Sequence, residues 1–248
     1  MRLLRSLALV AALVASLPTT ALAEPAGSAS RSLQAGMLDA GNHTCAIAAD
    51  GVAYCWGSGS LGRLGVGDLA DRSVPTRVLL PAGSTARSIS ASTGAHAWAV
   101  LRDGRIACWG DDSEGQVGNG PGPTTEPTPV LASLPVGRTA QQVSTGDVHT
   151  CALLDDGAIA CWGSDSNGRL GNGAPLANTD EPVLVTLPVG RLATAVSVGD
   201  SHSCAILDDG SLRCWGSDFD GQLGDGRPSP TSPRPSRSSF PPAGEPSR

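Results

Sequence analysis

Residues 146–173 read GDVHTCALLDDGAIACWGSDSNGRLGNG, and residues 199–226 read GDSHSCAILDDGSLRCWGSDFDGQLGDG. Two earlier segments carry the same pattern of a histidine, an Asp-Gly pair and a closing Trp-Gly. The histidines are each 53 residues apart, and so are the tryptophans: His43, His96, His149, His202, Trp56, Trp109, Trp162 and Trp215. A constant period near 50 residues is typical of units that bury a shared core by stacking on neighbours. The pattern therefore indicates a repeated framework.

Each unit contains four short runs rich in β-forming residues. In the last copy the runs are Pro182–Pro188, Ala193–Gly199, Ser203–Leu207 and Leu212–Trp215, separated by turn residues. We find no helical spacing of apolar residues after the first 23 positions. Four strands per unit with glycine-rich joins predict an all-β fold. We expect a β-propeller-type array of four blade-like units, each with four short antiparallel strands.

The Asp-Gly pair specifies the hairpin inside each unit. If Gly51 adopts the left-handed conformation in a three-residue loop, Ala48 faces Val52 and Cys45 lies opposite Cys55. Opposed strand residues have Cα atoms about 4.5–5.5 Å apart, which a disulfide spans. The same count in the other units predicts three cross-strand disulfides in all: Cys45 with Cys55, Cys151 with Cys161, and Cys204 with Cys214.

The seventh cysteine has no such partner, because Trp98 stands where the second unit would carry its first cysteine. We expect Cys108 to be an unpaired, buried residue covered by the Trp98 ring. A reactive thiol and an intermolecular bridge are the alternatives. A zinc site made of His43, Cys45 and Cys55 would fail in the second unit and would need reduced thiols, so no metal is predicted there.

The first residues indicate export. Arg2 and Arg5 precede the apolar run Leu7–Leu17, and small residues at Ala21 and Ala23 suit cleavage before residue 24. We therefore predict a signal peptide over residues 1–23, a repeat array over 24–226, and a disordered tail rich in Pro, Ser and Arg over 227–248. The expected location is periplasmic or extracellular, where disulfides form. The apolar run is too short to span a membrane, and we predict no membrane insertion.

Composition argues against a nucleic acid partner. The formal net charge is −6 and the pI is about 5.1, whereas phosphate binding needs a concentrated basic face. Aromatic residues make up only 3% of the chain, and half of them are the repeated tryptophan. Platforms for stacking bases or sugars are therefore not expected.

The two quoted units resemble repeats of the regulator of chromosome condensation family. The shared signature is a Gly-x-x-His start, an Asp-Gly turn, Trp-Gly and a closing Gly-Gln/Arg-Leu-Gly-x-Gly, in four copies over about residues 25–226. The resemblance implies a propeller and, from secreted bacterial members, protein binding. It does not imply the nuclear exchange activity of the family's founder, because export would separate the protein from that partner. Family propellers typically have seven blades, so four units would close as a small ring, stay open, self-associate to complete a ring, or represent a truncated array.

The repeated residues receive structural roles in this interpretation. We predict that each imidazole makes a hydrogen bond to backbone near the start of a strand, and that each tryptophan packs between blades. No unique Ser/His/Asp set remains, so we predict no catalytic residue, no cofactor and no enzyme activity.

The acidic loop after Trp-Gly is a weak calcium candidate. Oxygen-bearing side chains alternate before a glycine, as at the start of a calcium loop: Asp165, Asn167, Asp218 and Asp220. The downstream glutamate of a full calcium loop is missing. The alternative is that Asp112 and its repeat equivalents cap a tight turn through backbone hydrogen bonds.

A binding surface is expected where the copies differ. Apolar residues placed in variable loops are the candidate partner contacts: Leu61, Leu69, Leu176 and Phe219. We therefore predict a secreted, non-enzymatic scaffold that binds a protein. A structural or envelope component is one alternative, and a propeller lyase or hydrolase with a site in the central channel is another.

Overall fold

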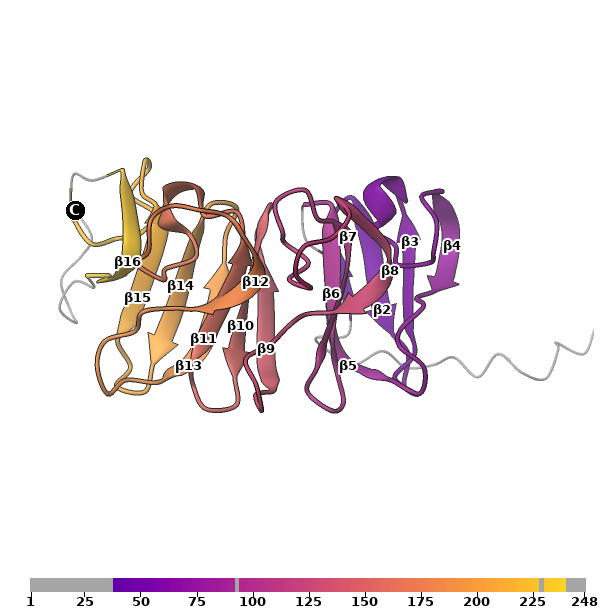
Figure 1. The fold of residues 1–248 in the computed structure, drawn as a ribbon, viewed down its shortest axis with the longest axis horizontal. Helices are drawn as coiled ribbons and strands as arrows, with labels where there is room; N and C mark the ends of the chain where they lie inside the picture. Colours follow the sequence, from indigo (N-terminus) through magenta and orange to yellow (C-terminus); the bar gives the residue numbers. More distant parts are fainter. Residues whose placement is uncertain (1–37, 92–93, 228–229, 240–248) are drawn as a thin grey trace, which may run out of the picture. The chain divides into compact units, whose positions relative to one another are not determined.

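The structure is a computed structural model that describes residues 38–91, 94–227 and 230–239. These residues all belong to one compact unit of the chain. They form four antiparallel sheets of four strands each, so the predicted fold class is confirmed (Figure 1). The first blade contains β1 (Leu38–Ala40), β2 (His43–Ile47), β3 (Ala53–Gly57) and β4 (Arg72–Arg77). The second contains β5 (Ala86–Ala91), β6 (His96–Leu101), β7 (Ile106–Asp111) and β8 (Thr125–Leu131).

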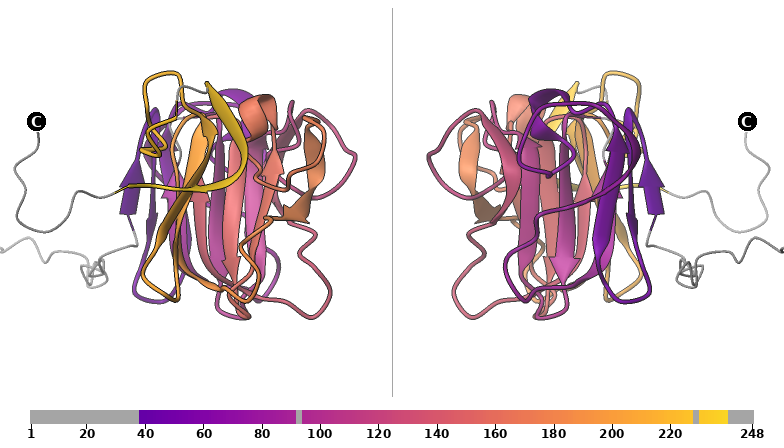
Figure 2. Two further views of the ribbon diagram at one scale, coloured as in Figure 1. Left: turned by 90° about the vertical axis from the view of Figure 1, so that its left-hand side faces the viewer. Right: turned by 90° about the vertical axis from the view of Figure 1, so that its right-hand side faces the viewer.

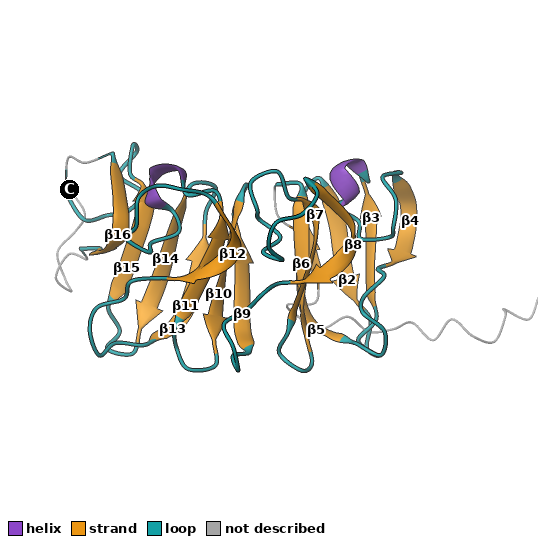
Figure 3. Ribbon diagram, in the orientation of Figure 1, coloured by secondary structure: helices purple, strands orange, loops and turns teal. Residues whose placement is uncertain are grey.

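The third and fourth blades repeat this order. The third contains β9 (Ala140–Thr145), β10 (His149–Leu154), β11 (Ile159–Gly163) and β12 (Thr179–Leu184). The fourth contains β13 (Ala193–Val198), β14 (His202–Leu207), β15 (Leu212–Ser217) and β16 (Thr231–Arg237). Two 3-10 turns, η1 (Ser60–Gly62) and η2 (Ser166–Gly168), begin the loops between the third and fourth strands of the first and third blades (Figure 3).

The fourth strand of each blade corrects the sequence interpretation in two ways. The run after Pro182, which we grouped with the last unit, instead contributes to β12, and Leu184 of this strand pairs with Ala160 in the third blade. The fourth blade takes its fourth strand from the tail, so the prediction of disorder over 227–248 is wrong for Thr231–Arg237. Residues 1–37 and 240–248 lie outside the described residues, and the predicted signal peptide is among them.

The prolines of β16 explain why the composition of this segment predicted disorder although it forms a strand. Proline cannot donate to a β-ladder, but an edge strand is paired on one side only and tolerates it. The four outer strands all contain proline, and three of these prolines are 53 residues apart: Pro129, Pro182 and Pro235. Ser236 adds a hydrogen bond from its Oγ to the Cys214 carbonyl, 3.1 Å. A strand rich in Pro, Ser and Arg is thus held as an outer edge.

The hairpin prediction is confirmed in detail. Gly51 has φ +82°, its N–H donates to the Ala48 carbonyl at 2.8 Å, and the Ala48 N–H donates to Val52 at 2.9 Å. Cys45 therefore pairs with Cys55 across the strands. All three predicted disulfides are present, with Cα–Cα distances of 4.1–4.2 Å. Cys108 is unpaired and buried opposite Trp98, and burial raises the pKa of its thiol.

The hydrophobic core consists of three clusters, each between consecutive blades. Trp109, Trp162 and Trp215 are fully buried in these clusters. In the part of the chain that the structure describes, no such cluster joins the first blade to the fourth. The central blades are accordingly buried on both faces, as every residue of β6 and β10 shows, whereas residues in β14 alternate in exposure. Figure 2 shows the array from its two ends.

Reduction of the disulfides is expected to destabilise the fold. Each disulfide closes a loop with a sequence separation of 10 residues. By loop-closure entropy each contributes about 2–3 kcal/mol to the free energy of unfolding. Thermal melting with and without reducing agent measures the effect, and Cys108→Ala is the control that leaves all three pairs intact. An unchanged melting temperature after complete reduction would contradict the prediction.

Candidate functional site

A polar junction connects the second and third blades beside the buried tryptophan. His96 Nε2 lies 3.1 Å from Thr150 Oγ1, and that hydroxyl donates to the Gln116 carbonyl at 3.0 Å. The Trp162 indole N–H donates to the same carbonyl at 2.8 Å. The Thr150 hydroxyl donates its only proton to the Gln116 carbonyl. The His96 Nε2 atom is therefore protonated and donates to Thr150 Oγ1.

The third and fourth blades are joined in the same way. His149 Nε2 lies 2.9 Å from Ser203 Oγ, which donates to the Arg169 carbonyl at 3.1 Å. Trp215 donates to that carbonyl at 2.9 Å. We call this set of contacts the His–hydroxyl–Trp junction. It corrects the expectation that these imidazoles bond to backbone, because His96 and His149 instead use Nε2 to reach a side-chain hydroxyl of the next blade.

The junction between the first and second blades is incomplete. Trp109 donates to the Arg63 carbonyl at 2.9 Å, as its equivalents do. Ala97, however, occupies the position of the hydroxyl, and neither ring nitrogen of His43 has a hydrogen-bond partner among the described residues. A buried polar group without a partner costs folding free energy, so this junction is the weakest of the three.

Burial keeps the junction histidines neutral. Desolvation lowers the pKa of His96 to about 3, with His43 adding a smaller coulombic contribution. Desolvation and then the Arg63 charge lower the pKa of His43 to about 4, although Asp39 acts in the opposite direction. The pKa of His149 also lies well below its usual value, mainly through desolvation. Neutral, inaccessible imidazoles are suited to structure and poorly suited to proton transfer.

The aspartate that recurs in the loops of the second, third and fourth blades caps a turn. The Oδ1 atoms of Asp112, Asp165 and Asp218 accept from the backbone N–H five residues on, at 2.9, 3.0 and 2.9 Å. Asn167, another calcium candidate, adopts φ +65° inside the 3-10 turn. Asp220 uses its N–H to bond Gln222 Oε1 at 2.9 Å. The described ranges contain no group of three or more His, Cys, Asp or Glu residues arranged to hold a metal.

The loops between third and fourth strands emerge at the same end of every blade (Figure 3). Four apolar residues of these loops are exposed by 42–69%: Leu61, Leu69, Leu176 and Phe219. We call the loops of residues 58–71, 112–124, 164–178 and 218–230 the variable-loop surface, of which residues 228–229 are not described. The structure thus places the four candidate partner contacts that we predicted from the sequence in loops at the same end of each blade.

A pocket of about 380 Å³ opens between two of these loops. Asp112 and Glu114 line it from one blade, and Asn178 and Asp180 line it from the next. Asn178 donates to the Glu114 carboxylate, and the Gly120 N–H donates to the Asp180 carbonyl at 2.8 Å. Desolvation raises the pKa of Asp112 to about 6, and the neighbouring acids add to the shift. Sequence analysis missed this pocket because the two residues that bond to each other across it, Glu114 and Asn178, are 64 residues apart in the chain.

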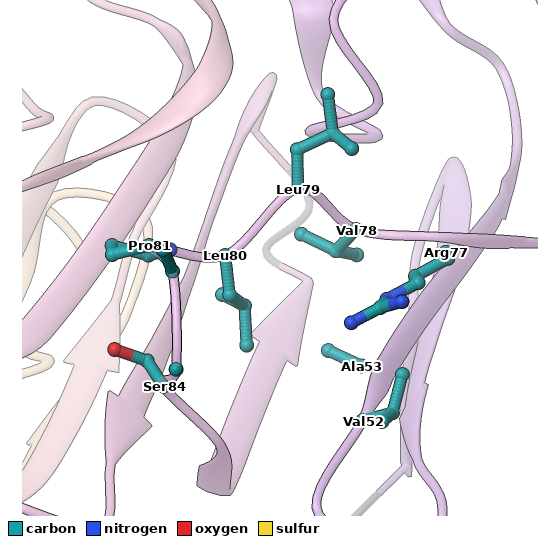
Figure 4. Close-up of a pocket in the computed structure, with 10 residues that line it drawn as sticks. Val52, Ala53, Arg77, Val78, Leu79, Leu80, Pro81 and Ser84 are labelled. Carbon is teal, nitrogen blue, oxygen red and sulfur yellow. The ribbon is translucent and has the colours of Figure 1, made fainter.

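A smaller pocket, of about 200 Å³, lies beside the connection from β4 to β5. Val52, Val78, Leu80 and Pro81 contribute apolar side chains, and Arg77 is the one charged residue of its lining (Figure 4). It lacks a second charged group that would fix a polar ligand. We interpret it as a crevice formed where the chain crosses between blades.

Comparison with known families agrees with this architecture. Models of the regulator of chromosome condensation (RCC1) repeat match residues 50–101, 103–153 and 156–206, and also 140–169 and 193–222. The chain belongs to the regulator of chromosome condensation repeat family. The matched segments are out of phase with the blades, since the first begins at the β2–β3 hairpin and ends in β6. The family's sequence repeat therefore spans parts of two blades.

Several relatives share this repeat. The ultraviolet-B receptor UVR8 of Arabidopsis thaliana is 35% identical over 191 residues, which are 77% of this chain and 43% of UVR8. The mitochondrial RCC1 domain-containing protein RUG3 of the same plant is 33% identical over 198 residues, 74% of this chain and 42% of RUG3. Among solved structures, human WBSCR16 superposes with a TM-score of 0.73 at 25% identity, covering 82% of this chain and 52% of that one. Yeast Prp20 gives 0.69 at 20% identity, covering 82% and 50%.

Restoring the missing hydroxyl is expected to stabilise the first junction. Ala97→Ser places an Oγ where Ser203 and Thr150 stand, within reach of His43, and adds about 1 kcal/mol to the free energy of unfolding. Ala99→Ser is the matched control, because Ala99 is buried in the same strand and has no such histidine across from it; we expect it to destabilise. Urea unfolding of both variants measures the difference. Equal destabilisation by Ala97→Ser and Ala99→Ser would contradict the prediction that a hydroxyl at position 97 bonds to His43.

The neutral histidines also predict acid sensitivity. Their folded pKa values lie below the unfolded value of about 6.5, so unfolding takes up protons and stability falls as the pH drops below about 6.5. At pH 5, His43 and His96 each lower the free energy of unfolding by about 2 kcal/mol relative to pH 7.5, and His149 acts in the same direction. The raised pKa of Asp112 works in the opposite sense, because that carboxyl binds a proton more readily when folded.

Chemical denaturation at pH 5 and pH 7.5 measures this loss. His43→Asn is the informative variant, because His43 makes no hydrogen bond among the described residues and its removal deletes one titrating group. We expect the variant to lose less stability between the two pH values than the parent. A parent protein equally stable at both values would show that the imidazoles are not held neutral.

Proposed function

We propose that this chain is a secreted, non-enzymatic scaffold that binds a protein through the variable-loop surface. The observation that carries the proposal is that the repeated residues and the variable residues of the units have different roles. The repeated His, hydroxyl and Trp groups are used up in contacts between blades. The apolar residues that differ between copies are exposed in the loops at one end of each blade, where a partner has access to them.

The chemistry of the variable-loop surface supports a protein partner. It combines exposed apolar side chains with an acidic pocket, a mixture typical of protein interfaces. Glu114 and Asp180 would favour a basic side chain of the partner. Yeast Prp20, which binds Gsp1p and histones, is a family precedent for protein binding. This chain spans only about half of such relatives, so its own partner is part of the proposal.

Secretion rests on the cysteines and the N-terminal sequence. Three disulfides persist in oxidising compartments and are rare in the cytosol. The charged and apolar pattern of residues 1–23 is typical of a signal peptide. In the described ranges no helix is long and apolar enough to cross a membrane.

Affinity capture tests the proposal. The chain with its disulfides formed is immobilised and exposed to the secreted and periplasmic proteins of its source. We expect one stoichiometric partner, whose affinity falls about tenfold or more for Phe219→Ser or for Glu114→Lys, because few residues dominate a protein interface. Val189→Ser is the control, since Val189 is fully exposed in the connection at the other end of the blades. Failure to capture any partner, or a partner insensitive to both loop variants, would overturn the proposal.

A further inference from the structure

Every blade has two unlike faces. Its forward face, toward the next blade, carries the histidine and the carbonyl that accepts two hydrogen bonds. Its rear face, toward the preceding blade, carries the hydroxyl and the tryptophan. Each His–hydroxyl–Trp junction therefore joins a forward face to a rear face. Among the described residues, no blade covers the rear face of the first blade or the forward face of the fourth blade.

The rear face of the first blade retains its half of the junction. Thr44 stands at the repeat position of Thr150 and Ser203, and no described blade precedes it. Trp56 is half-buried, whereas its three equivalents are fully buried. The described residues offer no carbonyl to its indole N–H. The second blade has a blade before it, yet it carries Ala97 in place of this hydroxyl. The first blade carries Thr44 although no described blade lies before it, so contacts within the array do not explain the Thr44 hydroxyl.

The forward face of the fourth blade retains the other half. His202 stands at the position of His96 and His149, and Gln222 at that of Gln116, whose carbonyl accepts both bonds. Ile206 is 46% exposed, although its equivalents Val100 and Leu153 are at most 4% exposed against a following blade. This face thus offers an imidazole, a free carbonyl position and an uncovered apolar side chain.

We propose that the forward face of the fourth blade binds the rear face of the first blade in a second copy of this chain. His202 then bonds Thr44 of the other copy, and the Gln222 carbonyl accepts from Thr44 and Trp56. The interface continues the contact that the chain already makes three times between its own blades. This inference is independent of the proposed function.

Head-to-tail pairing also fits the length of the array. A heterologous contact closes into a ring when the rotation allows and otherwise grows into a filament. The chain covers 52% of human WBSCR16 and 50% of yeast Prp20, so two copies supply about as many blades as one of those chains. We therefore expect a dimer with two equal interfaces, each formed by one forward and one rear face.

Sedimentation equilibrium of the full chain, with its disulfides formed, tests the pairing. We expect twice the chain mass and a concentration-dependent change in Trp56 fluorescence as its ring becomes buried. Thr44→Arg alters the rear face and Ile206→Arg the forward face, so either variant alone damages both interfaces and is expected to be monomeric. Val189→Arg, on an exposed turn, is expected to remain dimeric.

Mixing the two monomeric variants gives the decisive result. One of the two interfaces in a mixed dimer joins an unaltered forward face to an unaltered rear face, so we expect the mixture to recover dimers that neither variant forms alone. Circular dichroism and melting curves verify that each variant is folded. A monomeric parent at all concentrations would overturn the proposal, as would a dimer insensitive to either variant or a failure of the folded variants to complement. Partner capture through the variable-loop surface is unaffected by these substitutions, so the two proposals fail separately.

Discussion

One carbonyl oxygen at each complete junction holds two blades in register. It accepts from both a hydroxyl and an indole N–H of the next blade, as Gln116 and Arg169 do. The adjoining imidazole donates to that hydroxyl, so four groups satisfy one another in a space closed to water. Apolar packing between blades is non-directional, so polar contacts such as this one, together with bonds like that from Gln142 to the Val196 carbonyl, fix how one sheet lies on the next.

The second blade departs most from the common pattern. Ala97 and Trp98 replace a hydroxyl residue and a cysteine at adjacent positions, which removes a hydrogen bond toward the first blade and a disulfide within the hairpin. Trp98 is 4% exposed and packs in the cluster toward the third blade, where its ring occupies space that a disulfide fills elsewhere. Apolar packing there offsets a lost cross-link, but His43 remains without a partner among the described residues.

Sequence reasoning succeeded where structure depends on local counting. The Asp-Gly turn fixes which residues oppose one another, and this gave the hairpin register and three cysteine pairs. It failed where the relevant contact is distant or polar. The edge strand β16 has no apolar alternation, the hydroxyl partner of His96 lies 54 residues away, and the Glu114–Asn178 pocket forms only when two loops meet. Direction of a side chain between blades is not encoded in the spacing of a single repeat.

The two unlike faces of a blade have a consequence for how such arrays change in evolution. A copied 53-residue unit would bring both a histidine face and a tryptophan face with it, so it would fit between any two existing blades without alteration of either neighbour. Recombination between near-identical units would then lengthen or shorten the array in whole blades. Substitutions like that at position 97 would be carried along as local defects, and the loops would diversify while the junctions stay compatible.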